Sequence, residues 1–138
     1  MPNSLANVEG NSSVNDFLNA SSFRMQMVFD ASQFGALGGS STLSNRIDKI
    51  EFRIDGASSG DVLHSFGGAS ITLSTTTRTP DSLSPVFAEN IGSDAVTIVA
   101  RSISFAYTYF PGESPQRFGG FTATAPFYYD PSKGNLLV

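Results

Sequence analysis

One segment of the sequence matches a known nucleophile motif, the Gly/Ser stretch at residues 56–60. It reads GASSG and fits the pattern G-x-S-x-G, in which Ser58 would be the nucleophile of a serine hydrolase. That mechanism needs a strand before the serine and a helix after it, and residues 61–68 show no helical period. The single histidine, His64, follows too closely in sequence to be the usual distant partner of such a serine. The motif therefore favours a plain turn, and a serine hydrolase ranks third among the expected functions.

Aspartates in turns are the candidate metal ligands. Asp55 and Asp61 flank the Gly/Ser stretch, and Asp81, Asp94 and Asp130 also lie in turn sequences. Calcium binds loop carboxylates and carbonyls, so Asp55 and Asp61 are the predicted ligands of a calcium ion. No D-x-D-x-D-G loop is present, and the commoner role of a turn aspartate is to bond its own backbone. Calcium is the one cofactor to consider, and none is required for the expected function.

The sequence predicts no catalytic residues. One histidine and no cysteine cannot supply the three or four ligands of a zinc site. A glycosidase needs two carboxyl groups across a cleft, and no spacing in the sequence pairs the four glutamates with the eight aspartates. Chemistry at an active site is therefore not expected.

Four tyrosines could bind a ligand by stacking. Tyr107, Tyr109, Tyr128 and Tyr129 could present aromatic faces to the apolar patches of sugars, as in a carbohydrate-binding module. Alternating aromatic residues in strands are more often core or cross-strand packing. Tyr128 and Tyr129 are adjacent, so in a strand they must point to opposite faces.

Charge and composition exclude several classes of protein. The net charge is −4, and the eight basic residues are scattered, whereas binding to a nucleic acid requires a clustered positive surface. No apolar run approaches the roughly 20 residues of a membrane span. Gly, Pro, Ser, Thr and Asn account for 59 of the 138 residues, a composition typical of strands and turns rather than long helices.

Alternation of apolar and polar residues predicts an all-β fold. Period-two patterns over residues 23–30, 46–55, 69–77, 95–110 and 121–129 predict strands separated by turns. We expect a mainly antiparallel β-sandwich or jelly roll over residues 23–138, preceded by a flexible polar arm over residues 1–22. Short helical turns are expected at residues 31–34 and around Phe87. The alternation changes phase near residues 99–102, and Pro126 interrupts the last long strand, so both places predict a bulge or an edge.

The last residues predict a terminal strand. Leu136, Leu137 and Val138 follow a turn and are all apolar. Three alternatives are open: the strand closes its own sheet, it belongs to a longer domain, or it pairs with another subunit. In the third case these residues, with the N-terminal arm, would assemble a homo-oligomer or filament by strand exchange.

Three stretches resemble a known group of proteins. Residues 24–34 (RMQMVFDASQF), 73–84 with 87–92 (LSTTTRTPDSLS and FAENIG) and 127–137 (FYYDPSKGNLL) resemble markers of PEP-CTERM, exosortase-sorted bacterial proteins. The resemblance spans about residues 5–138, but the sorting tail is absent, so the chain resembles a front portion or a shortened version. It implies an exported surface or matrix protein and carries no catalytic residues.

The expected function follows from these features together. We expect a secreted, extracellular or cell-surface bacterial protein with a structural or adhesive role, whose most natural partner is itself. No signal peptide is visible at the start of the sequence, so either the protein is cytosolic or a signal peptide was removed; the Ser/Thr/Asn/Gly-rich, Lys-poor composition favours the second. The second expectation is a carbohydrate-binding module that binds glycans.

Overall fold

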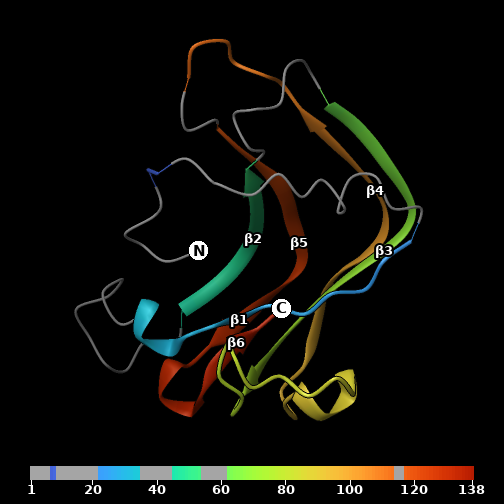
Figure 1. Cartoon of the computed structure of the whole chain (residues 1–138). Coiled ribbons are helices and arrows are strands. Elements are labelled where there is room, and N and C mark those ends of the chain that lie inside the picture. The colour runs from blue at the N-terminus through green and yellow to red at the C-terminus, as the bar shows by residue number, and fades with distance from the viewer. Residues whose placement is uncertain (1–6, 9–21, 35–44, 54–61, 114–116) are drawn as a thin grey trace.

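The computed structural model describes residues 7–8, 22–34, 45–53, 62–113 and 117–138, and its strands form two antiparallel sheets (Figure 1). The larger sheet has four strands in the order β1 (Val28–Phe29), β6 (Asn135–Leu137), β3 (Val62–Thr76) and β4 (Val96–Tyr107). The smaller sheet pairs β2 (Asn45–Arg53) with β5 (Phe118–Tyr129). In the described ranges, three short 3₁₀ helices lie in the connections: η2 (Ala31–Gln33), η3 (Phe87–Asn90) and η4 (Pro131–Lys133). The all-β, sandwich-like prediction is confirmed. The predicted N-terminal arm lies almost wholly outside the described residues.

The core is formed by side chains from both sheets. Its buried members are Leu73, Ile98, Val99, Ile103, Phe121, Phe127, Tyr129 and Leu136. Ile47, Ile50 and Phe52 of β2 pack against this cluster, so the period-two pattern over residues 46–55 places Ile50 and Phe52 on the core side of the strand. Burial of this apolar surface is the main force that holds the two sheets together.

The strand predicted over residues 23–30 is mostly not a regular strand. β1 covers only Val28 and Phe29, although Met27 exchanges two backbone hydrogen bonds of 2.9 Å with Val138. Period-two alternation is typical of a half-buried strand, but Phe23 and Met25 are 44% and 45% exposed. The chain before Met27 therefore follows the direction of β1 without joining the ladder.

Two bulges shape the β3–β4 ladder. The strand predicted over residues 69–77 begins earlier, at Val62; β3 runs through Gly67 and Gly68, with a register shift between Phe66 and Ala69. A second shift lies between Ile71 and Thr72, opposite Val99 and Thr97. Ile98 and Val99 are consecutive and both fully buried, because a bulge lets two neighbouring residues point to the same side. The predicted break in the alternation of β4 is thus confirmed near its expected place.

Pro126 marks an irregularity in β5, as predicted. Ile47 of β2 pairs with Phe127, but Lys49 pairs with Thr122, so several residues of β5 around the proline have no partner in the ladder. Proline lacks the N–H that a regular ladder needs at every second position. Thr124, in the same segment, donates a hydrogen bond of 2.9 Å to the carbonyl of Ile98 on β4, which ties the two sheets together.

The terminal strand closes the sheet of its own chain. β6 lies between β1 and β3, with Leu136 paired to Phe29 and Thr75, and Leu137 paired to Val28 and Ser74. Leu136 and Leu137 are 5% and 3% exposed. Of the three alternatives for this strand, the structure shows the first, because both edges of β6 are already paired within the chain.

The three sequence stretches that carry the resemblance meet at one end of the fold. Asn135 accepts a hydrogen bond of 2.9 Å from the Ala31 N–H and donates one of 2.8 Å to the Arg78 carbonyl. Tyr129 packs edge-on against Phe34, with ring centroids 4.9 Å apart. We call the packed residues 24–34, 73–92 and 127–137 the three-segment junction. Each stretch thus contributes to the same local structure.

Candidate functional site

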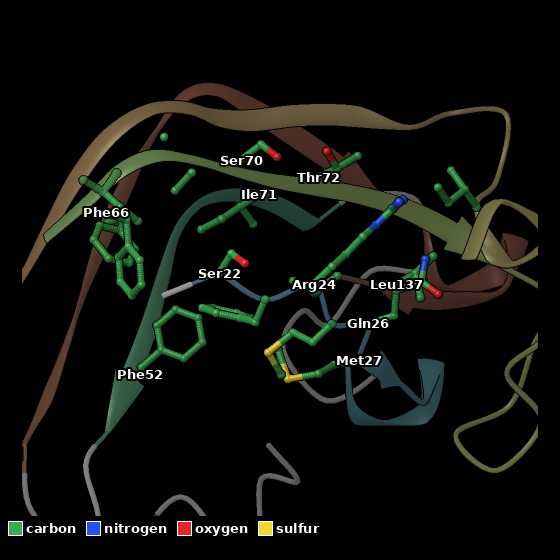
Figure 2. A pocket seen from close by; sticks show the side chains of 18 of the residues that line it. Ser22, Arg24, Gln26, Met27, Phe52, Phe66, Ser70, Ile71, Thr72 and Leu137 are labelled. Atoms are coloured by element: carbon green, nitrogen blue, oxygen red, sulfur yellow. The ribbon is translucent and has the colours of Figure 1, made fainter. Parts of the chain in front are cut away.

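A pocket of about 730 Å³ lies between residues 22–27 and β3 (Figure 2). We call it the edge pocket. Its walls are residues 22–27, Phe52, residues 65–72, Ser74, Ile91, Ile103, Phe121 and residues 137–138. Figure 2 shows residues 22–27 and β3 as its two long sides, with Leu137 at one end. The end of β6 therefore forms one limit of the pocket.

One edge of β3 borders this pocket. Along its other edge β3 pairs with β4 from Val62 to Leu73. In the described part of the chain, the pocket-side edge pairs with β6 only, at Ser74, Thr75 and Thr76. Residues 65–72 of β3 line the pocket. An edge with N–H and C=O groups directed outward is a template for another strand.

The side of the pocket nearest the core is apolar. Ala69 and Ile71 of β3 pack against the core cluster, and Phe23 and Met25 lie across from them at the other wall. Phe23 packs edge-on against Phe66, with ring centroids 6.0 Å apart, and this contact joins the two walls at the end away from Leu137. The exposed side chains of Phe23 and Met25 therefore form part of the pocket wall.

The opposite side of the same segment is polar and anchored. Arg24 lies over the ring of Phe87, 4.8 Å from its centroid, which is a cation–π contact. Gln26 donates to the Phe87 carbonyl (3.1 Å) and accepts from the Asn90 side chain (2.7 Å). Asn90 is only 2% exposed and also bonds the backbone of Ser84. These contacts hold residues 24–26 at a fixed position beside the pocket.

The predicted tyrosines do not form one platform. Tyr128 is 60% exposed, whereas Tyr129 is fully buried and donates a hydrogen bond of 2.7 Å to the Gly134 carbonyl. The expectation that they point to opposite faces is confirmed, and Tyr129 is a core residue. Tyr109 is half-buried beyond the end of β4. The backbone of Tyr107 pairs with Val62, but its side chain lies outside the described residues.

Two carboxylates at the three-segment junction, those of Asp30 and Asp130, cap turns. Asp30 accepts from the Ser32 N–H, and Asp130 accepts from the N–H and the hydroxyl of Ser132. The hydrogen bonds from Ser32 and Ser132 lower the pKa of Asp30 and of Asp130 below the usual value. Burial, with a smaller contribution from these two negative charges, raises the pKa of Tyr129 to about 12. The tyrosine is therefore a neutral hydrogen-bond donor at any physiological pH.

The predicted calcium ligands and the predicted nucleophile lie outside the described residues. Asp55, Asp61 and Ser58 belong to residues 54–61, and of His64 only the backbone is described, in β3. The chain after this segment continues as the strand β3 from Val62, whereas a nucleophile elbow leads into a helix. Among the residues that the structure describes, no three or more histidines, aspartates or glutamates come together to hold a metal ion.

Leu136, Leu137 and Val138 were the predicted assembly residues. The first two are buried inside the sheet, and Val138 packs against the core while it bonds to Met27. These residues help to hold β1 and β3 together in the larger sheet. Sequence reasoning did not find the edge pocket, which requires knowing that residues 22–27 lie beside β3. The one available signal was the apolar alternation of Phe23 and Met25, which continues the phase of Phe29.

None of the helices in the described part of the chain has the length and apolarity that crossing a membrane requires. No protein-family model, curated protein or solved structure matches the chain.

Proposed function

We propose that this chain is a non-catalytic structural or adhesive protein of a bacterial extracellular surface or matrix, and that its molecules associate by pairing strands. The observation that carries the proposal is the edge of β3 that faces the edge pocket, beside the exposed side chains of Phe23 and Met25. A sheet edge next to apolar side chains offers both backbone hydrogen bonds and apolar contact to another chain.

The position of β6 changes the mode of association that the sequence suggested. Since β6 is paired on both sides within the chain, the proposal assigns strand pairing between molecules to another strand edge. The pocket-side edge of β3 takes that role as an acceptor. Export to a surface or matrix is supported by the resemblance of residues 24–34, 73–92 and 127–137 to exosortase-sorted proteins, and by the low charge and the Ser/Thr/Asn-rich composition.

Static light scattering over a wide range of protein concentrations tests association. We expect the mean mass to rise with concentration. Met25→Glu, which places a charge in the edge pocket, should reduce this rise, because a desolvated charge would face apolar atoms. Val86→Glu changes another exposed apolar residue (53% exposed) that does not line the pocket, and it should behave like the wild type. A strictly monomeric wild-type protein at the highest concentration would contradict the proposal.

A carbohydrate-binding module is the second candidate, and the exposure of Tyr128 favours it. Tyr128 lies on β5 opposite Arg46 of β2, and Arg46 forms an ion pair of 3.1 Å with Asp48. An exposed ring beside charged hydrogen-bonding groups is a usual way to contact a sugar. Binding on a glycan array that is lost in Tyr128→Ala and kept in Phe118→Ala, which alters another exposed ring of β5, would favour this candidate.

A further inference from the structure

The outer face of the β2–β5 sheet carries two exposed aromatic rings. Phe121 and Phe127 of β5 are buried in the core, so the residues that alternate with them point outward. Tyr128 and Phe118, near the two ends of β5, are 60% and 43% exposed. They are two of the three aromatic rings with such exposure in the described part of the chain. We call the outward side chains of β2 and β5 the ribbon face.

Each ring of the ribbon face lies beside an arginine of β2. Tyr128 is paired with Arg46, and Phe118 is paired with Arg53. The Arg53 guanidinium lies 5.0 Å from the centroid of the Phe118 ring, so both side chains are on the same face. Arg46 and Arg53 are the second and the last residues of β2, which places the two rings roughly 20 Å apart at about 3.3 Å per residue. A single sugar residue cannot reach both rings, but a linear chain of sugars can.

A row of alternating charges along β2 runs beside the two rings. A bulge lets two neighbours share the outer face, so the outward residues are Arg46, Asp48, Lys49, Glu51 and Arg53. Arg46 forms an ion pair of 3.1 Å with Asp48, Lys49 forms one of 2.7 Å with Glu51, and all four side chains are 40% or more exposed. Exposed ion pairs contribute little to stability, so a polar ligand can share their hydrogen bonds. The row therefore offers donors and acceptors in turn.

This combination favours a neutral glycan. A sugar hydroxyl both donates and accepts hydrogen bonds, and the C–H groups of a pyranose ring form an apolar face that stacks on an aromatic ring. An acidic polymer would meet Asp48 and Glu51 on a chain whose net charge is −4. A lipid or an apolar peptide would remove water from five charged side chains without pairing them.

The middle of the ribbon face and its shape favour a single extended chain. Gly120 and Thr122, which pair with Glu51 and Lys49, are small and leave a low path between the two rings. Strands twist, and Figure 1 shows β2 and β5 curved along their length, so the face is not flat. A flexible single chain can follow this face, whereas the flat surface of a crystalline polysaccharide cannot touch both rings.

We propose that the ribbon face binds one neutral, linear polysaccharide chain. Tyr128 and Phe118 are its two stacking positions, and the charged row of β2 bonds the hydroxyls between them. The inference rests on the second candidate function, which requires only a contact at Tyr128, and it adds the class of glycan and the second ring. It is independent of the association through β3.

Calorimetric titration with the disaccharide and the hexasaccharide of cellulose, xylan and mannan tests the proposal. We expect at least one hexasaccharide to bind at least tenfold more tightly than its disaccharide. Phe118→Ala should remove this gain and leave the disaccharide unchanged, whereas Tyr128→Ala should weaken both by about tenfold. Val86→Ala, which removes an exposed apolar side chain elsewhere, should change neither by more than about twofold. Chemical-shift mapping of the labelled wild type needs no variant and should show changes at residues 45–53 and 118–128.

Several results would overturn the inference. Binding that does not strengthen with chain length, and that only Tyr128→Ala abolishes, would contradict it and leave the second candidate function standing. Failure of all these sugars would contradict it too, and the glycan array then decides the second candidate separately. Equal binding of the hexasaccharide of polygalacturonate would show that charge governs the contact. Retention on crystalline cellulose without binding of soluble chains, or shifts centred on β3 and β4, would also contradict it.

Discussion

At the scale of single residues, Asn135 connects parts of the chain that are remote in sequence. Its side chain accepts from Ala31, 104 residues away, and donates to the Arg78 carbonyl. A side-chain amide can serve one backbone donor and one backbone acceptor at once, which an aliphatic residue cannot. Asn135 therefore fixes the position of η2 and of the segment after β3 relative to β6.

Replacing Asn135 with alanine should destabilise the fold. Two partly buried backbone groups would lose their partners, and we expect a loss of about 2–4 kcal/mol in the free energy of unfolding. Urea unfolding followed by circular dichroism measures it. Asn7→Ala, at an exposed residue, is the matched control and should change stability by less than about 0.5 kcal/mol. Equal midpoints for the two variants would show that Asn135 does not hold the junction together.

Tyr129 makes stability depend on alkaline pH. Its pKa in the folded protein is about 12, above the ordinary tyrosine value of about 10, so the unfolded chain loses this proton first as the pH rises. The contribution to stability is complete below pH about 10 and is lost as the pH rises through about 12.

Tyr129→Phe isolates this contribution. The variant should lose about 1–2 kcal/mol at neutral pH, because the Gly134 carbonyl loses its donor. Above pH about 10 its stability should fall less steeply than that of the wild type. Denaturation midpoints measured at a series of alkaline pH values provide the comparison. Parallel curves for both proteins would mean that the hydroxyl ionises with the same pKa in the folded and unfolded chain.

At the scale of elements, two glycines in strands should respond differently to the same substitution. A Cβ at Gly120 would overlap the Ile50 carbonyl oxygen of the paired strand β2, whereas a Cβ at Gly67 would have no described atom within 4 Å. Gly120→Ala should cost about 1–3 kcal/mol, since the β2–β5 ladder must move apart. Gly67→Ala should be close to neutral. Thermal unfolding of the two variants checks this, and a similar effect at both sites would contradict the close approach of β2 and β5.

The sequence predicted the strands better than their arrangement. The alternation in residues 46–53 and 118–129 is a local property, because neighbouring side chains of a strand point to opposite faces whatever their partners are. The irregularity at Pro126 is local too. The order of strands is not local: β1 and β6 pair across almost the whole chain, and no pattern within Leu136–Val138 shows that these residues lie between β1 and β3.

The same reason explains what could and could not be predicted about the candidate site. The opposite orientations of Tyr128 and Tyr129 follow from their adjacency. The edge pocket depends on residues 22–27 lying beside a strand that is distant in sequence. Period-two alternation over residues 23–30 predicts a strand, but it cannot show that only Val28 and Phe29 belong to the sheet.

At the scale of the whole molecule, the two ends of the larger sheet differ. The three-segment junction is closed by hydrogen bonds of Asn135, Asn90 and Tyr129, and no buried side-chain polar atom in the described residues lacks a partner. Farther along, β3 has one edge paired with β4 and the other facing the edge pocket. A sheet whose one end is closed by hydrogen bonds, and whose strand β3 has an edge at a pocket, suits a protein that acts by pairing with other chains.

The most direct test of this account is amide hydrogen exchange, measured by mass spectrometry at low and high protein concentration. We predict that the amides of residues 22–26, and those of residues 65–72 that point away from β4, exchange readily in the dilute protein and gain protection as the molecules associate, while β2 and β5 do not change. Concentration-dependent protection confined to β2 and β5, or none in either place, would contradict the claim that this chain assembles through the pocket-side edge of β3.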